Sequence, residues 1–359
     1  MTKDNSTAKA TSERQNLPLL TGLRGLAAAI VVVSHAANIG LLPSVLGQGF
    51  GQVGVMLFFV LSGYLMGYLY LGQSPTRANI AGYAAARVGR VVPLFLAVVG
   101  ASALISTVAG SAFRYYLPLS DPTTIGQALL FMRAPYELWT IPVEVQFYVV
   151  FALMWALVPR LGRAVLWYGA GALGTLAVLH LVLLHGNVAV LPKYSLMFML
   201  GVLTAAYLPG IKRSLASRTP AFAGVLVLAL VAFNLPILRE NAGLSLTPGD
   251  YFMSTWYDPL TIALVYALFL CCVLNLRSLS FLDSQAFVFL GTISYGLYLL
   301  HRPLREAAGA LLGTSPLALT AGFAASVALA WLSFRHFEQP VARVIRARAR
   351  RRFPRHAIA

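Results

Sequence analysis

The chain has 359 residues, of which 58% are hydrophobic and only 11% charged, with a formal net charge of +16 at pH 7. Soluble domains carry about 25% charged and about 45–50% apolar residues, so this composition excludes an ordinary soluble protein. The mean hydropathy of the whole chain is +0.75, so the apolar excess is not confined to one anchor. We therefore expect the lipid bilayer to be the main solvent of one membrane domain.

Ten apolar segments are of the length at which a helix crosses a bilayer, which is about 20 residues. They lie at 18–40, 51–72, 90–109, 138–159, 164–184, 193–208, 219–237, 258–275, 284–304 and 315–337. The sequence thus predicts an all-α, polytopic membrane protein of about ten transmembrane helices. A polar leader at 1–16 precedes the membrane domain at 17–340, and a basic tail at 341–359 follows it.

The positive side chains predict the orientation, because cytoplasmic loops carry an excess of Lys and Arg. With the N-terminus inside, 20 of the 27 Lys and Arg residues fall in inner loops and tails, and six, including Arg302 and Arg305, fall in outer loops. An even number of crossings then puts both termini in the cytoplasm. Because most cations mark topology in this way, we expect membrane lipid and no nucleic acid as a partner.

The two cysteines, Cys271 and Cys272, are adjacent and lie in an apolar segment. This spacing offers neither a disulfide framework nor a set of metal ligands. We expect both to be small buried residues, and we expect no metal site.

The first predicted helix contains Arg24 and His35. Ionisable side chains in a spanning segment cost a few kcal/mol and are candidates for function. The rise from Arg24 to His35 is roughly 16 Å, which places Arg24 near the inner boundary and His35 in the middle to outer half. Arg24 could instead extend to the inner interface, and His35 could be a packing residue. A neutral, buried His35 would be able to accept a proton as a general base.

The fourth predicted helix carries Glu144 at a depth close to that of His35. A carboxylate beside a histidine fixes its tautomer and stabilises the imidazolium that forms during proton transfer. The alternative is a glutamate that pairs with an arginine for packing. We predict that His35 and Glu144 form a catalytic pair.

At the inner end of the third predicted helix, Arg87 and Arg90 share a helix face. Two guanidinium groups on one face suit a phosphorylated ligand, although such a pair can also mark only the cytoplasmic side. A last polar group, with Tyr295 and His301, lies near the outer end of the ninth predicted helix. His301 at an interface can also be a packing residue.

Together these segments resemble the acyltransferase-3 family of integral-membrane O-acyltransferases over nearly all of the chain. The family's motifs look like Arg24 with His35, Gly54–Tyr64, Arg87-x-x-Arg90-x-x-Pro93, Trp139–Tyr148, Ile293–His301 and Phe337–Pro340. Departures exist, because Thr21, Pro142 and Val145 stand where many members carry Asp, Ser and a second Glu. None of them removes a residue that the expected chemistry needs.

The resemblance implies transfer of an acyl group, usually acetyl, from cytoplasmic acetyl-CoA or another acyl-CoA to a hydroxyl outside the bacterial inner membrane. The donor is a substrate, and no permanently bound cofactor is implied. The acceptor we expect is an exopolysaccharide or O-antigen sugar, lipid-linked, with polysaccharide-assembly proteins as partners and no fused secreted hydrolase-like domain. In this scheme the CoA phosphates are held by Arg24, Arg87 and Arg90, and the acceptor site is shaped by Trp139, Tyr295 and His301.

Two other functions stay open. One is O-acylation of a small molecule such as a macrolide. The other is transport of a small anion or glycan intermediate, with Arg24, His35 and Glu144 as its polar pathway. A transporter has no need of paired arginines at the inner face.

Overall fold

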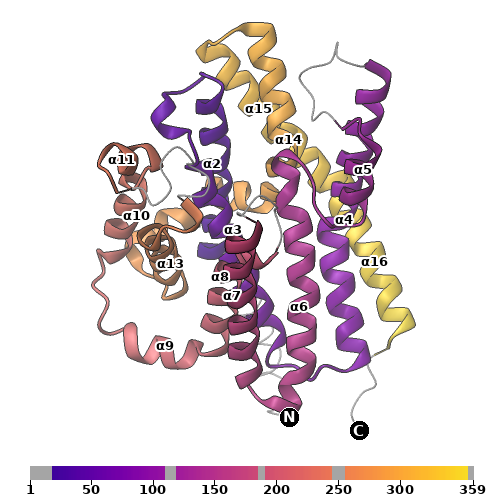
Figure 1. The fold of residues 1–359 in the computed structure, drawn as a ribbon, viewed down its shortest axis with the longest axis vertical. Coiled ribbons are helices and arrows are strands. Elements are labelled where there is room, and N and C mark those ends of the chain that lie inside the picture. Colours follow the sequence, from indigo (N-terminus) through magenta and orange to yellow (C-terminus); the bar gives the residue numbers. More distant parts are fainter. Residues whose placement is uncertain (1–17, 110–118, 185–190, 245–254, 355–359) are drawn as a thin grey trace.

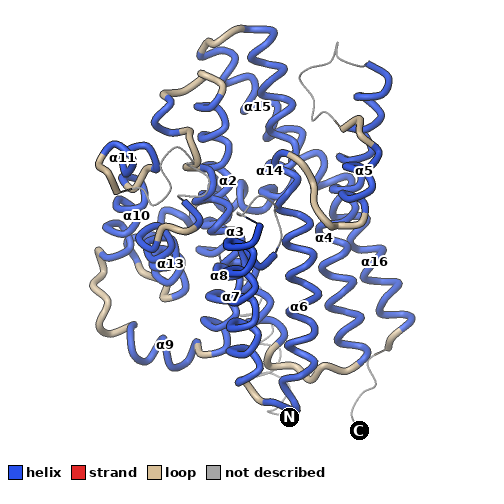
Figure 2. Tube along the Cα trace, in the orientation of Figure 1, coloured by secondary structure: helices blue, strands red, loops and turns tan. Residues whose placement is uncertain are grey.

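The computed structural model describes residues 18–109, 119–184, 191–244 and 255–354. Every regular element in these ranges is a helix, in agreement with the predicted all-α class, and Figure 2 shows no strand among them. In chain order the elements are α2 (Pro18–Asn38), η1 (Ser44–Leu46), α3 (Gly51–Tyr70), α4 (Arg77–Ala109), α5 (Pro122–Leu129), η3 (Tyr136–Trp139), α6 (Thr140–Leu161), α7 (Ala164–Leu184), α8 (Leu191–Ala206), α9 (Leu208–Leu215), α10 (Ala223–Phe233), α11 (Pro236–Asn241), α13 (Pro259–Val273), η4 (Arg277–Asp283), α14 (Gln285–Leu312), α15 (Pro316–Ser333), η5 (Phe334–Glu338) and α16 (Gln339–Arg352).

Each of the ten predicted segments contains a helix. By length and composition, five helical stretches in the described residues can cross a membrane. Two further pairs, α8 with α9 and α13 with η4, bend by 81° and 84°, and they raise the number to seven if each pair is one span. The chain is therefore a polytopic membrane protein, while ten crossings and two cytoplasmic termini stay predictions.

Helix α14 is longer than the sequence predicts, because it continues to Leu312 instead of ending at residue 304. Its added turns are rich in Ala, Leu, Arg and Glu, which favour helix without adding a membrane-type apolar signal. An ion pair between Arg302 Nε and Glu306 Oε1, 2.6 Å long and four residues apart, supports the same turns. Arg302 and Arg305 therefore lie in a helix, and their expected place in an outer loop is wrong.

The described part of the basic segment after residue 340 also forms a helix, α16. It packs along α4, and the two run side by side in Figure 1. Gly89 of α4 permits this contact, since a Cβ there would lie 3.1 Å from the Cα of Ala342. Ala and Arg favour helix as strongly as any residues do, which explains why this polar sequence is helical.

Helix α2 is central, and it packs against both α3 and α14 (Figure 1). Its approach to α14 is close enough to require glycine on both helices. A Cβ on Gly291 would lie 1.9 Å from the carbonyl oxygen of Thr21. One on Gly25 would lie 2.2 Å from the carbonyl oxygen of Phe287. This contact brings the polar residues of α2 and α14 together.

Candidate active site

Two cavities meet at a set of three arginines. A wide cavity of about 950 Å³ and a narrow chamber of about 60 Å³ are both lined by Arg24, Arg87 and Arg90. Arg87 and Arg90 come from one face of α4, and the contact of α2 with α14 places Arg24 beside Ser294, whose hydroxyl is 3.4 Å from Arg24 Nη2. The structure thus brings the three predicted phosphate ligands together, and their binding role stays a prediction.

The wide cavity lies where the first described helix begins and the last one ends. Its lining includes Leu20 and Thr21 from α2 and Phe353 and Pro354 after α16. The start of α2 and the end of α16 therefore lie at the same end of the molecule, as an even number of crossings would require.

Glu144 lines the narrow chamber with the arginines. Its Oε1 accepts hydrogen bonds from the Ser62 hydroxyl at 2.7 Å and from the Tyr148 hydroxyl at 2.5 Å. The Tyr148 ring also lies under the guanidinium of Arg87, 5.9 Å from its central carbon. Glu144 is the one acidic side chain among the described residues that line either cavity. It therefore offsets the charge of the arginines.

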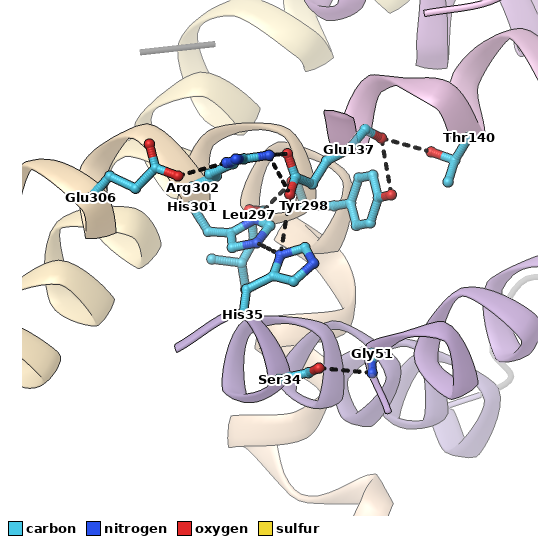
Figure 3. Close-up of polar contacts among 10 residues, drawn as sticks. All are labelled: Ser34, His35, Gly51, Glu137, Thr140, Leu297, Tyr298, His301, Arg302 and Glu306. Carbon is cyan, nitrogen blue, oxygen red and sulfur yellow. Dashed lines mark hydrogen bonds and ion pairs between the residues drawn. The ribbon is translucent and has the colours of Figure 1, made fainter. Parts of the chain in front are cut away.

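His35 has a different carboxylate partner from the one predicted (Figure 3). Its Nδ1 lies 3.5 Å from Oε1 of Glu137. Glu137 belongs to η3 and precedes Glu144 by seven residues. Both carboxylate oxygens of Glu137 accept hydrogen bonds from Arg302 Nη1, at 3.1 and 3.0 Å. The expectation that Glu144 orients His35 is wrong because helix depth alone does not say which helix a side chain faces.

His35 and His301 form a hydrogen-bonded pair (Figure 3). His35 Nδ1 is 2.8 Å from His301 Nε2, and the two rings meet edge to edge at an interplanar angle of 13°, with centroids 5.1 Å apart. His301 is fully buried, whereas the side chain of His35 keeps 19% of its exposure. Of the two, only His35 has a partly exposed side chain.

The surroundings of His301 assign the tautomers of the pair. His301 Nδ1 lies 2.8 Å from the carbonyl oxygen of Tyr298 and 3.0 Å from that of Leu297. A carbonyl oxygen only accepts, so Nδ1 of His301 carries a proton and, in the neutral ring, Nε2 accepts. The hydrogen bond between the rings then runs from His35 Nδ1–H to His301 Nε2. This arrangement leaves the lone pair of His35 on Nε2, for which no described residue provides a hydrogen bond.

Two aromatic side chains stand between the narrow chamber and this histidine pair. Phe58 and Tyr298 both line the chamber, and their rings meet edge to face with centroids 6.2 Å apart. The Tyr298 hydroxyl donates to the Glu137 carbonyl oxygen at 3.0 Å. Neither His35 nor His301 lines either cavity, so these two cavities do not extend the polar channel predicted between Arg24 and His35 as far as His35.

The remaining predicted residues are divided between the chamber and the core. Tyr295 lines the chamber, and its hydroxyl donates to the carbonyl oxygen of Val91, which ties α14 to α4. Trp139 lines neither cavity, because its ring packs against Tyr194, with centroids 4.5 Å apart, and against Trp256. The acceptor-binding roles of both residues stay predictions.

Sequence reasoning missed Arg305, which lies one turn beyond His301 on α14. Its side chain is only 4% exposed, and its Nε and Nη1 have no hydrogen-bond partner. A buried guanidinium with two nitrogens that lack hydrogen-bond partners is costly, which makes Arg305 a candidate for function. The spacing of four residues from His301 is the signal that could have found it.

Cys271 and Cys272 are buried and form no disulfide. Among the described ranges, no three His, Cys, Asp or Glu side chains are grouped closely enough to hold a metal ion.

The fold and the buried charges define a class, a helical membrane protein with an ionisable site inside the bundle. The family model described as an acyltransferase domain matches residues 18–335. This match covers most of the chain, which therefore belongs to the acyltransferase-3 family of membrane acyltransferases, as its motifs predicted. No curated protein matches the chain, and no solved structure does.

Proposed function

We propose that the protein transfers an acyl group, in the first place acetyl, from cytoplasmic acyl-CoA to a hydroxyl of an extracytoplasmic or lipid-linked glycan. The observation that carries the proposal is the pair of cavities that share Arg24, Arg87 and Arg90, with His35 beyond them. Family membership indicates the type of reaction. In the proposal, the arginines bind the donor and His35 acts as the general base. The same membership weighs against the transporter alternative.

The donor end of the proposal rests on charge and shape. Guanidinium groups bind phosphate through paired hydrogen bonds, and three of them meet where the cavities join. The wide cavity, at about 950 Å³, falls within the range of about 300–1,000 Å³ that holds ordinary ligands. The narrow chamber, at about 60 Å³, accepts only a thin chain such as the pantetheine arm. The nucleotide would thus stay in the wide cavity while the thioester advances through the chamber.

The chemical step follows from the tautomers of the histidine pair. Nε2 of His35 takes the proton of the acceptor hydroxyl as the oxygen attacks the thioester carbonyl, a general-base contribution of about 10²–10⁴ in rate. Glu137, 3.5 Å from Nδ1, stabilises the imidazolium that results. The new C–O bond forms as the C–S bond breaks, and the His35 imidazolium returns its proton to the departing CoA thiolate, which leaves as the thiol. Acyl transfer by way of Nε2 of His35 is a variant that the same geometry permits.

His301 is reassigned in this scheme from substrate binding to positioning. It is fully buried, and its Nε2 accepts the hydrogen bond from His35 Nδ1–H. It therefore fixes the tautomer of His35 without touching the acceptor. Phe58 and Tyr298 line the chamber on the side of the histidine pair, with the centroid of the Tyr298 ring 6.2 Å from that of His301. In this scheme the thioester passes these two side chains on its way to His35.

The acceptor is proposed to be an exopolysaccharide or O-antigen sugar at the outer side of the bacterial inner membrane. His35 lies roughly 16 Å along α2 from Arg24, so the base is far from the end at which the donor enters. A small-molecule acceptor such as a macrolide would need the same general base. The base therefore does not distinguish the two acceptor classes, and an experiment must do so.

The experiment is mass spectrometry of the surface glycan from a deletion strain. Acetyl groups should disappear in the deletion, return with the wild-type gene, and stay absent with His35→Ala at matched protein level. An unchanged glycan in the deletion strain would rule out the proposed acceptor. Full restoration of acetylation by His35→Ala would rule out His35 as the general base.

A further inference from the structure

The basic helix α16 presents only two of its arginines to the wide cavity. Arg346 and Arg350 line that cavity, whereas the other arginines of the helix do not. The two are four residues apart, so they share one helix face. Arg343 and Arg348 lie on the same helix outside the lining, and they provide internal controls.

The position of this helix is fixed by its packing. Ala342 packs against Gly89 of α4, which lies between Arg87 and Arg90 in the sequence of that helix. Arg346 follows Ala342 by one turn, and its Nε donates to the Ala342 carbonyl oxygen at 3.1 Å. The α16 pair is therefore held at the same cavity as the α4 pair.

The charge of the cavity wall favours an anionic ligand. Its lining contains five arginines and, among the described residues, no aspartate or glutamate. Nε of Arg87 is buried and has no hydrogen-bond partner. Five like charges around one space repel each other, and a ligand with several negative charges would offset that repulsion. Arg346 and Arg350 line only the wide cavity, so they meet a part of that ligand farther from the narrow chamber than Arg24, Arg87 and Arg90 do.

We propose that Arg346 and Arg350 bind the 3′-phosphate at the adenosine end of coenzyme A and make the protein select CoA over 3′-dephospho-CoA. The inference rests on the proposed function. In CoA the pyrophosphate lies between pantetheine and ribose, and the 3′-phosphate lies at the end opposite the thioester. With the thioester in the chamber, the pyrophosphate meets the three shared arginines and the 3′-phosphate meets the α16 pair. Tyr70 and Phe353, which also line the wide cavity, offer aromatic faces to the adenine.

The test measures equilibrium binding of CoA and 3′-dephospho-CoA to the full-length protein in phosphatidylcholine nanodiscs. The wild type should prefer CoA by roughly 10- to 100-fold, the effect of one or two charge-assisted hydrogen bonds. The double variant Arg346→Gln/Arg350→Gln should lose this preference while its affinity for 3′-dephospho-CoA is unchanged. The matched control Arg343→Gln/Arg348→Gln should keep the preference.

Three results would overturn the inference. The double variant could keep the wild-type preference, or it could lose both ligands equally. In nanodiscs with phosphatidylglycerol, the α16 pair could govern binding of that lipid and leave the CoA preference unaffected, which would assign the pair to a lipid headgroup. If the wild type binds neither CoA form, the proposed function itself fails, and this outcome is distinct from the other three.

Discussion

At the scale of single residues, Glu137 and Glu144 have separate tasks. Glu137 faces His35 and Arg302, and Glu144 faces Ser62 and Tyr148 beside the arginines. Glu137→Gln should lower kcat by about 10- to 100-fold with little change in CoA affinity, because only the imidazolium loses its carboxylate. Glu144→Gln should weaken CoA binding instead, since Tyr148, over whose ring the Arg87 guanidinium lies, loses its carboxylate partner. Steady-state kinetics together with donor binding would check this split, and the reverse pattern would restore Glu144 as the partner of His35.

Arg305 gives a second prediction at this scale. Its buried Nε and Nη1 lack partners, so the native protein bears the cost of a desolvated charge. Arg305→Met should therefore keep or raise the melting temperature in detergent while it lowers acyl transfer. A variant that melts earlier and keeps full activity would show that Arg305 is a structural residue.

Single residues also show what the sequence can predict of the site. Arg24, Arg87, Arg90 and His35 stand out because ionisable groups are costly in apolar segments. The partner of His35 was assigned incorrectly, since Glu144 matches it in depth, and depth follows from residue counting. The direction in which each helix faces depends on tertiary packing, and no single sequence states it.

At the scale of elements, hydropathy located the ten apolar segments because burial in lipid demands apolar runs. It missed the extension of α14 and the helix α16, whose Ala- and Arg-rich sequences form helix without an apolar signal. Arg305 and the α16 arginines lie in these two places. Several of the residues that sequence reasoning overlooked thus lie on helices that continue past the apolar core.

The close contact of α2 with α14 gives a prediction for elements. Gly291→Ala would place a Cβ 1.9 Å from a backbone oxygen of α2, so the helices must separate. Unfolding should become easier by about 1–3 kcal/mol, and activity should fall because Arg24 and His35 move away from α14. Gly171→Ala on α7 is the matched control, since a Cβ there meets nothing within 4 Å. Equal stability of the two variants in thermal unfolding would contradict the role of this contact.

At the scale of the whole molecule, the proposal requires the wide cavity to face the cytoplasm. Cys271 and Cys272 are buried, so a cysteine introduced on the surface should be the main site of labelling. In intact cells an impermeant maleimide should label Met132→Cys, which is 56% exposed near α5, and spare Arg348→Cys on α16. Inside-out vesicles should show the opposite pattern. Labelling of Arg348→Cys in intact cells would show that the topology is the opposite of the one proposed, and it would contradict a cytoplasmic donor.

The central claim is tested most directly by acyl transfer in inside-out membrane vesicles from a strain that makes both this protein and its glycan acceptor. Labelled acetyl-CoA is supplied at the cytoplasmic face, and incorporation into glycan is compared between the wild type and His35→Gln. The account predicts that the wild type incorporates label, whereas His35→Gln binds acetyl-CoA with wild-type affinity and incorporates at least about 100-fold less. Incorporation by His35→Gln at the wild-type rate would contradict the account.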